Sequence, residues 1–510
     1  MSAVLLQPAP TVAADDLNIQ HLFAGRATTV RAELVYLALP ALLFFGAYLS
    51  PSFGLPLASA LMVGLLSVFL TRGEVQSAWS TAGVATVFGA IAIMLAGFPS
   101  GPYVWDWVKH WAIANELARN SWPVSIDLNG VESSLRFYLG AYLVPAGLVK
   151  LLPGVGIHAA LGAWFFLGYV LVFRGVAQLA GSRWKAVAAC LIVLVMGGAD
   201  AYAEHAVRAL QKLSSAPWFG LHYDAWATHA FGLPIEFSSM LTALVWVPHQ
   251  SIATFIVSML LLFNRQANGY SAAVLAYGLL ALWSPYGMIG LLPLMVLVTV
   301  DNRSELLRLR TALCVVVGVA IALAVAAYLS TELPAGGACF TCIGGRLDQT
   351  PRVLVFLLIE LCAFGLILRR RLLQDITCVV SLGPLIVLPF LYGNTPDLVM
   401  RASMGPLFVL TLRSIQTLFE GGATTTQRSL QILAFVLCVP AAISEAVYVQ
   451  QGASAHQQYS EKDPLGAKWI KSVAARTDFD AKSFFDYCGW EFKPQYFAKS
   501  PPRLTGGRAP

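Results

Sequence analysis

The first group of residues with chemical potential lies in segment 105–116, where Asp106, Lys109 and His110 supply a carboxylate, an amine and an imidazole within five positions. Wound as a helix, this segment predicts an apolar stripe on one side and these three groups, with Glu116, on the other. A carboxylate at a membrane surface can accept the proton of an attacking hydroxyl. Asp106 is therefore a candidate catalytic base, which Lys109 or His110 would orient. The alternative is a surface ion pair between Asp106 and either neighbour.

The second group follows an apolar run and contains Asn394, Asp397 and Arg401. Pro396 suits the first turn of a helix, which would place Asp397 and Arg401 four positions apart on one face. The forked guanidinium of arginine forms paired, charge-assisted bonds to phosphate. We predict that Arg401 binds a phosphate and that Asn394 and Asp397 contact the substrate. An ion pair between Asp397 and Arg401 that only anchors the helix is the alternative, and both can hold together.

A third group lies in the long segment 200–240 and just after it. Glu204 and His205 are adjacent there, and His249 and Gln250 open the next apolar run. We predict substrate contacts for these four residues, with a structural role as the alternative for His249. The spacing of a typical metal-binding helix is absent, so no metal or other cofactor is predicted, and a divalent metal is only weakly signalled.

Most of the eight cysteines are scattered singly in apolar runs, where cysteine behaves as a small buried hydrophobe. Cys339 and Cys342 differ, because they lie in a loop with glycines on both sides. A zinc site would need a second pair of ligands, so we predict a local disulfide, with two free thiols as the alternative.

The composition is that of a membrane protein. Hydrophobic residues make up 57% of the 510 residues and charged residues 12%, whereas soluble domains carry about 25% charged residues. The net charge of +6 is small and no basic patch is present, which argues against nucleic-acid binding. The apolar runs predict an all-α, polytopic domain over 30–450 with about 13 spans. They lie near 30–50, 54–71, 79–97, 157–173, 185–199, 241–263, 271–286, 288–300, 311–330, 351–368, 374–392, 402–419 and 429–449.

The basic loops predict the orientation of the spans, because cytoplasmic loops are rich in Lys and Arg. All basic clusters fall on one side only if 136–152 lies along the interface, with Phe137 and Tyr142 at headgroup depth. The residues before 30 then form a cytoplasmic tail. The predicted external parts are the loop 98–156 with its juxtamembrane helices, the loop 200–240 and the tail 451–510, so the acids and bases crowd one external surface.

An acidic residue after an outward-going span, then a helix and a Pro-bearing apolar segment along the membrane, resembles the GT-C superfamily of membrane glycosyltransferases. Aminoarabinose transferases and protein O-mannosyltransferases are familiar members. In this family the first large external loop supplies the catalytic acid and two juxtamembrane helices follow it. Asp106 matches the acid by position, and 136–152 matches the second helix. Asp106 is followed by Trp107, however, where the family often has a second acid.

This resemblance implies an inverting transferase in a bacterial inner membrane. A polyprenyl-phosphate sugar would be the donor, and an envelope glycan, a lipid or a protein the acceptor. A polysaccharide ligase or polymerase is the first alternative, and His205 with Arg208 leaves it open. A transporter is the second, and it would require ionisable residues within the spans and broken helices.

Overall fold

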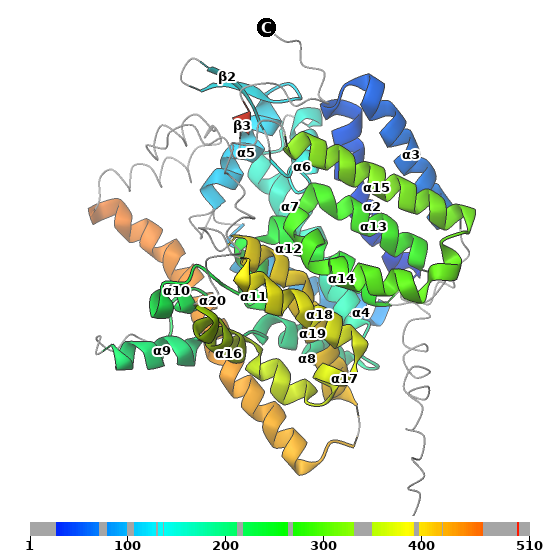
Figure 1. The fold of residues 1–510 in the computed structure, drawn as a ribbon. Coiled ribbons are helices and arrows are strands. Elements are labelled where there is room, and N and C mark those ends of the chain that lie inside the picture. The colour runs from blue at the N-terminus through cyan, green and yellow to red at the C-terminus, as the bar shows by residue number, and fades with distance from the viewer. Residues whose placement is uncertain are drawn as a thin grey trace, which may run out of the picture.

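The described part of the protein is almost entirely helical, and a small three-stranded sheet lies at one end (Figure 1). The computed structural model describes residues 27–70, 79–98, 107–128, 131–135, 137–152, 154–211, 218–263, 269–330, 349–391, 397–420, 422–462 and 497–498. The helices of the first half are α2 (Ala27–Leu43), extended by the π-helical turn Phe44–Tyr48, α3 (Pro51–Phe69), α4 (Trp79–Leu95), α5 (Trp107–Arg119), α6 (Leu143–Leu151), α7 (Ile157–Ala177), α8 (Arg183–Val195), α9 (Asp200–Leu210), α10 (Trp226–Phe231), α11 (Met240–Trp246) and α12 (Pro248–Phe263).

The second half continues as helices connected by short turns. These are α13 (Tyr270–Trp283), α14 (Pro285–Asp301), the 3-10 turn Arg303–Glu305, α15 (Leu309–Leu329), α16 (Thr350–Leu368), α17 (Arg371–Gln374), α18 (Ile376–Val387), the 3-10 turn Leu388–Phe390, α19 (Asp397–Phe419) and α20 (Thr425–Lys462). The strands β1 (Ser125–Leu128) and β2 (Val131–Leu135) form an antiparallel hairpin, and β3 (Phe497–Ala498) from the tail pairs with β2.

Eight of the described helices are long and apolar enough to cross a membrane by length and composition, which makes the chain compatible with an integral membrane protein. Five shorter apolar helices coincide with five further predicted spans. Each predicted span therefore corresponds to helix, but the number that crosses the membrane stays a prediction. The eight are Val30–Tyr48, Pro51–Phe69, Ile157–Ala177, Arg183–Leu210, Leu309–Leu329, Thr350–Leu368, Asp397–Phe419 and Thr425–Gln451.

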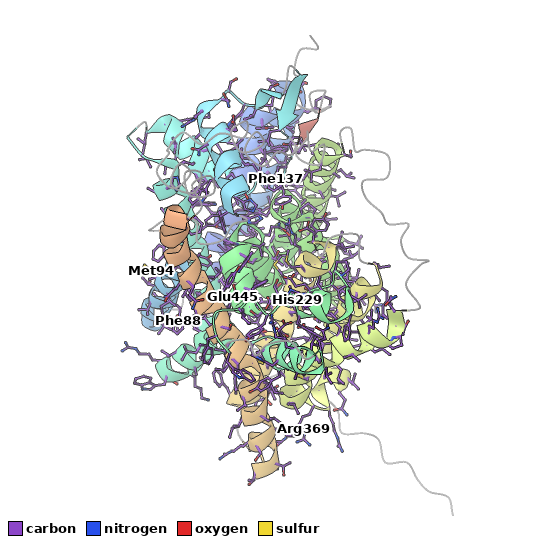
Figure 2. The ribbon with its side chains drawn as sticks, turned by 90° about the vertical axis from the view of Figure 1, so that its left-hand side faces the viewer. Phe88, Met94, Phe137, His229, Arg369 and Glu445 are labelled. Carbon is purple, nitrogen blue, oxygen red and sulfur yellow. The ribbon has the colours of Figure 1, made fainter. Side chains whose placement is uncertain are left out.

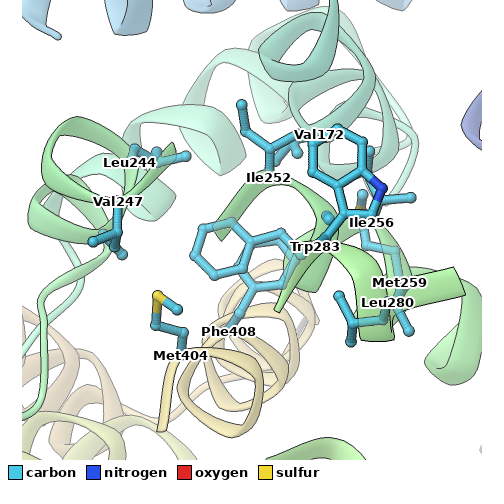
Figure 3. Packing of buried hydrophobic residues seen from close by; sticks show 14 of the residues in the cluster. Val172, Leu244, Val247, Ile252, Ile256, Met259, Leu280, Trp283, Met404 and Phe408 are labelled. Carbon is cyan, nitrogen blue, oxygen red and sulfur yellow. The ribbon is translucent and has the colours of Figure 1, made fainter. Parts of the chain in front are cut away.

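Helix α12 is the centre of the core. All 16 of its residues are buried, in contact with α7, α13, α14 and α19. Figure 3 shows its Ile252 and Ile256 among side chains from those neighbours, including Trp283 of α13 and Phe408 of α19. Since a helix surrounded by others has no solvent-facing side, the polar residues at its beginning are held inside the protein.

Helices begin at two X-Pro sequences. The expected span 241–263 is interrupted, because α11 ends at Trp246 and α12 begins at Pro248, whereas the predicted boundary between the spans 271–286 and 288–300 falls at Ser284, before Pro285. Proline lacks an N–H and restricts the preceding residue, so both sites favour a helix start. The expected loop 200–240 is also not a plain loop, because α9 and α10 lie within it.

The orientation expected for helix α5 is wrong. His110 and Glu116, predicted on an exposed polar side, are 0% and 5% exposed. Helix α6 and the first turns of α7 pack against α5, and its Trp107 and Trp111 are buried as well. Among its described residues, α5 thus has buried side chains on both its apolar and its polar side. The prediction from periodicity assumed that only the apolar side is covered, by the membrane surface, and could not anticipate this.

The segment 137–152 contains the nine-residue helix α6, which is too short to cross a bilayer alone. This length is consistent with the predicted interfacial position of the segment. Phe137 and Tyr142, however, are 4% and 0% exposed, so they are packed within the protein and are not exposed anchors.

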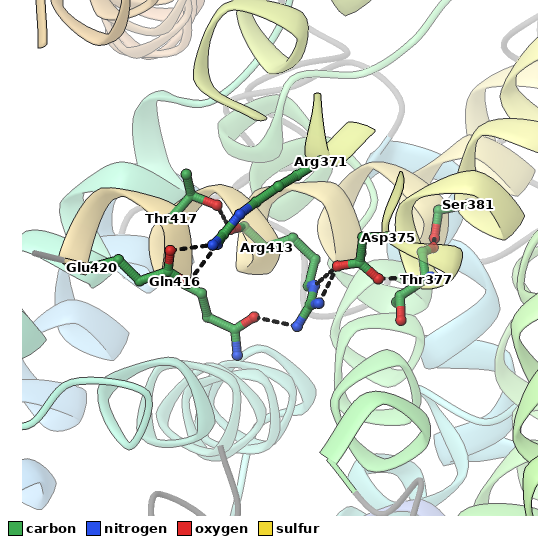
Figure 4. A network of polar contacts seen from close by, with 8 residues as sticks. All are labelled: Arg371, Asp375, Thr377, Ser381, Arg413, Gln416, Thr417 and Glu420. Carbon is green, nitrogen blue, oxygen red and sulfur yellow. Dashed lines mark hydrogen bonds and ion pairs between the residues drawn. The ribbon is translucent and has the colours of Figure 1, made fainter. Parts of the chain in front are cut away.

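The end of the protein opposite the sheet is held by ionic contacts between α17, α18 and α19 (Figure 4). Arg413 of α19 donates from Nε to Asp375 Oδ2 at 2.7 Å, and from its terminal nitrogen to Gln416 Oε1 at 2.7 Å. Arg371 and Glu420 form an exposed ion pair at 2.5 Å. Asp375 also caps α18 by accepting from the Thr377 N–H, so one carboxylate joins two helix ends.

Several predictions concern residues outside the described ranges. Residues 1–26, Cys339, Cys342 and most of the tail beyond Lys462 belong to this group. The five described cysteines are free thiols, four of them buried and one half-buried, which confirms their expected behaviour as small hydrophobes.

Candidate functional site

The fold brings five predicted site residues into one region of the interior. His110 comes from α5, His249 and Gln250 from the first turn of α12, and Asp397 and Arg401 from the first turns of α19. Tyr138, from the segment before α6, is the centre of their contacts. We call His110, Tyr138, His249, Gln250 and Arg401 the histidine–arginine cluster.

The position of Tyr138 depends on a close approach at Gly140. The Gly140 N–H donates to the Leu282 carbonyl at the end of α13, at 2.9 Å. A side chain at Gly140 would place its Cβ 2.7 Å from Trp283 Cγ, so only glycine lets this segment rest on α13. This contact holds the segment next to the break between α13 and α14. From there Tyr138 contacts Gln250 of α12 and Arg401 of α19.

Arg401 is a cation with little access to solvent. It is 6% exposed and pairs with Asp397 Oδ1 at 2.7 Å, as the four-residue spacing predicted. It also donates to the Tyr138 hydroxyl, and its guanidinium carbon lies 5.9 Å from the centre of the Tyr138 ring. A buried guanidinium at the start of a helix, next to a half-exposed carboxylate, presents the forked donors that suit a phosphate.

Gln250 orders the centre of the cluster. Its side-chain nitrogen donates to the Tyr138 hydroxyl at 2.9 Å and lies 3.1 Å from His249 Nε2, while its oxygen accepts from Ser284 at 3.0 Å. Since the amide nitrogen has only protons to offer, His249 Nε2 acts as the acceptor in this arrangement.

The rings of the two histidines lie close together in the interior, with their planes tilted by 43°. The ring centres of His110 and His249 are 4.0 Å apart, and both residues are 0% exposed. His110 Nδ1 lies 2.7 Å from the Tyr142 hydroxyl. Trp107, at the first turn of α5, contacts both rings, with centres 5.1 and 5.9 Å away. The cluster thus combines a guanidinium, two imidazoles, a phenol and an amide, which suits recognition of a phosphate and of sugar hydroxyls.

The other predicted site residues either lie away from the histidine–arginine cluster or fall outside the described residues. Asp106 and Asn394 are outside the described ranges, and so is the side chain of Lys109. Glu204 is bound to Arg208 at 2.8 Å, whereas His205 bonds the Tyr223 hydroxyl at 3.0 Å. His205 and Arg208, which lie close enough to interact electrostatically, therefore have separate hydrogen-bond partners.

A second group of buried ionisable residues, absent from the predicted site, lies beside the first. We call Asp200, Asp224, Glu236, Glu360 and Glu445 the acidic cluster, and all five are less than 9% exposed. No sequence motif points to Glu360 or Glu445. The only available signal is that each is a single acid in an apolar helix, and ionisable residues within membrane helices usually have a function. Figure 2 shows Glu445 at the same height in the view as His229, between the levels of Phe137 and Arg369.

Burial and mutual repulsion change the pKa values of the residues in the acidic cluster. Burial raises the pKa of Asp224 well above its usual range, an effect that His222 opposes and Asp200 increases. Burial likewise raises the pKa of Glu236, and the nearby carboxylates of Glu445 and Asp397 add to this rise. Because Asp397 pairs with Arg401, Glu236 connects the acidic cluster with the histidine–arginine cluster.

His222 is the cation that faces this cluster. Burial alone would lower its pKa, but Glu445, with Asp224 and Glu236, outweighs burial and raises the pKa of His222 to about 10. His222 Nδ1 donates to Glu445 Oε2 at 2.8 Å, and the Trp246 indole donates to the other oxygen at 2.5 Å. The imidazolium and Glu445 therefore form an ion pair that joins α20 to the segment before α10.

Glu445→Gln is expected to destabilise the protein by on the order of 3 kcal/mol below pH 6.5, because it removes one partner of this ion pair. A histidine whose pKa rises on folding stabilises the folded state fully below its unfolded pKa of about 6.5 and progressively less as the pH approaches 10.

Thermal unfolding of the original protein and of Glu445→Gln from pH 6 to 10 tests this expectation. The difference between the original protein and the variant should shrink across that range, and a constant difference would contradict the ion pair. Glu420→Gln, at an exposed ion pair, is the matched control.

No group of three or more His, Cys, Asp or Glu residues within the described part of the chain is arranged to hold a metal ion. Comparison with protein families, curated proteins and solved structures finds no match for this chain.

Proposed function

We propose that the protein is a membrane glycosyltransferase that transfers a sugar, with inversion, from a polyprenyl-phosphate donor to an envelope glycan, a lipid or a protein. The observation that carries this proposal is the buried Arg401, held by Asp397 and Tyr138 next to Gln250 and His249. The sequence resemblance to GT-C glycosyltransferases supports it independently.

In the proposed reaction the donor phosphate binds Arg401, whose forked donors suit its oxygens. Asp106 takes the proton of the acceptor hydroxyl as the oxygen attacks the anomeric carbon. The new glycosidic bond forms as the bond from that carbon to the phosphate oxygen breaks, and the electron pair leaves with polyprenyl phosphate. One displacement inverts the anomeric centre. Arg401 stabilises the charge that develops on the leaving phosphate.

The other residues of the cluster have roles in binding. His249, Gln250 and Tyr138 present hydrogen-bonding groups beside the guanidinium, where the sugar of a bound donor would lie. His110, in ring contact with His249 and hydrogen-bonded to Tyr142, would hold His249 in position. The cluster is buried, so these bonds form where water competes little.

The direct test uses purified protein in detergent and a panel of radiolabelled polyprenyl-phosphate sugars, with extracted envelope glycans, lipids and proteins as acceptors. We expect transfer from at least one donor, with an inverted linkage in the product. Transfer that retains the anomeric configuration would contradict the single displacement, and absence of transfer from every donor would overturn the proposed function.

Transport is the second candidate, because of where the acidic cluster lies. The sequence placed the acids on one external surface, yet Glu360 is 2% exposed and lies ten positions into α16, about 15 Å along a candidate span. Asp200 follows a break between α8 and α9. Buried acids and broken helices are typical of transporters. Substrate-driven proton flux into vesicles, without sugar transfer, would favour this candidate.

A further inference from the structure

The contact between α9 and α16 places two carboxyl groups together in the interior. Asp200 is the first residue of α9 and is 0% exposed, and Glu360 of α16 is 2% exposed. The Ala199 N–H donates to the Ile359 carbonyl at 3.2 Å, which joins the two chain segments one residue before each acid. A side chain at Gly198 would collide with the Asp200 carboxylate and lie 2.6 Å from Glu360 Oε2, so glycine there leaves the space that both carboxyls occupy.

The hydrogen bonds leave one side of each carboxyl facing the other acid. The Trp226 indole donates to Glu360 Oε1 at 2.8 Å, which leaves Oε2 toward Asp200. Neither oxygen of Asp200 has a hydrogen-bond donor among the described protein groups. Two ionised carboxylates in such a position would repel each other strongly, and burial makes each charge costly.

The groups around the pair make two negative charges still less favourable. Asp224 and Glu236 face it from the segment 218–239, and they outnumber the cationic His222. The thiols of Cys362 and Cys438 are further titratable groups near the pair. A single proton placed between two facing carboxyl groups removes one of the two negative charges and relieves their repulsion.

We propose that Asp200 and Glu360 form a proton-binding site, in which one proton is shared between Glu360 Oε2 and the Asp200 carboxylate. The proton on Glu360 donates to Asp200, which supplies the missing hydrogen bond. The N-terminus of α9 favours the ionised form of Asp200, so Glu360 is the protonated partner. The site lies within candidate membrane spans and is independent of the proposed sugar transfer.

Infrared spectroscopy of the full-length protein in nanodiscs tests the shared proton through the C=O stretch of protonated carboxyl groups, identified by its shift in heavy water. We expect Asp200→Asn and Glu360→Gln each to lower the band by the equivalent of one carboxyl at neutral pH. In either variant the new side-chain amide donates a hydrogen bond to the remaining carboxylate. That carboxylate then stays ionised, so the band of the protonated carboxyl group is lost. Both changes conserve shape, and thermal unfolding checks that each variant is folded.

Three outcomes would overturn the proposal. A band lost in Glu360→Gln but kept in Asp200→Asn would mean that burial alone protonates Glu360. A band unchanged in both variants would mean that neither acid carries a proton. Loss of the band on adding sodium or potassium chloride at constant pH would mean that a metal cation occupies the site. Glu420→Gln, at an exposed acid, is the matched control and should leave the band unchanged.

Discussion

Arg401→Ala is expected to raise the donor KM about 100-fold, because it removes the buried cation beside the proposed phosphate position. Hydrogen bonds to charged groups contribute about 1.5–3 kcal/mol each, and two such bonds correspond to this loss or more. Arg401→Lys keeps the charge but loses the forked geometry, so an intermediate effect is expected. The measurement is binding and transfer of the labelled donor at varied donor concentration.

The control for Arg401 separates phosphate binding from anchoring of α19. If the ion pair with Asp397 only anchored the helix, Asp397→Asn would weaken donor binding as much as Arg401→Ala does. We expect Asp397→Asn to bind donor at least as well as the original protein, because the guanidinium loses a competing anion. The exposed Arg428→Ala should have no effect. Equal losses in the Asp397 and Arg401 variants would contradict the phosphate role.

Asp106→Asn is expected to reduce turnover about 10²- to 10⁴-fold while donor binding is retained, since general-base catalysis contributes an acceleration of this size. Asp106 directly precedes Trp107, which contacts both histidines of the cluster. The measurement is the rate of transfer at saturating donor, with donor binding measured separately.

The alternative for Asp106, an ion pair with Lys109 or His110, makes a different prediction. His110 Nδ1 is bonded to Tyr142, so it has a partner other than Asp106. If Asp106 only paired with Lys109, then Lys109→Met would reproduce the loss, whereas a catalytic base predicts a much smaller effect of that change. Asp301→Asn, at the exposed last residue of α14, should leave turnover intact. Full activity of Asp106→Asn would remove the proposed base.

The local parts of the candidate site were predictable because they depend on spacing along a helix. The pair of Asp397 and Arg401 follows from two residues four positions apart, and His249 with Gln250 at the start of an apolar helix follows from Pro248 before them. The same periodicity was wrong for α5. It assumed one apolar and one solvated side, whereas α6 and α7 bury the polar side, including His110.

The amino-acid sequence by itself determined that this chain is helical, where its helices lie and that it is compatible with an integral membrane protein. Apolar run length and X-Pro breaks act within a few residues of chain, so they can be recognised without the tertiary structure. Only the tertiary structure decided which polar residues meet. Arg401 and Tyr138 are 263 positions apart, and Trp226 and Glu360 are 134 apart. Such contacts depend on how the helices pack around α12, and no local pattern encodes that packing.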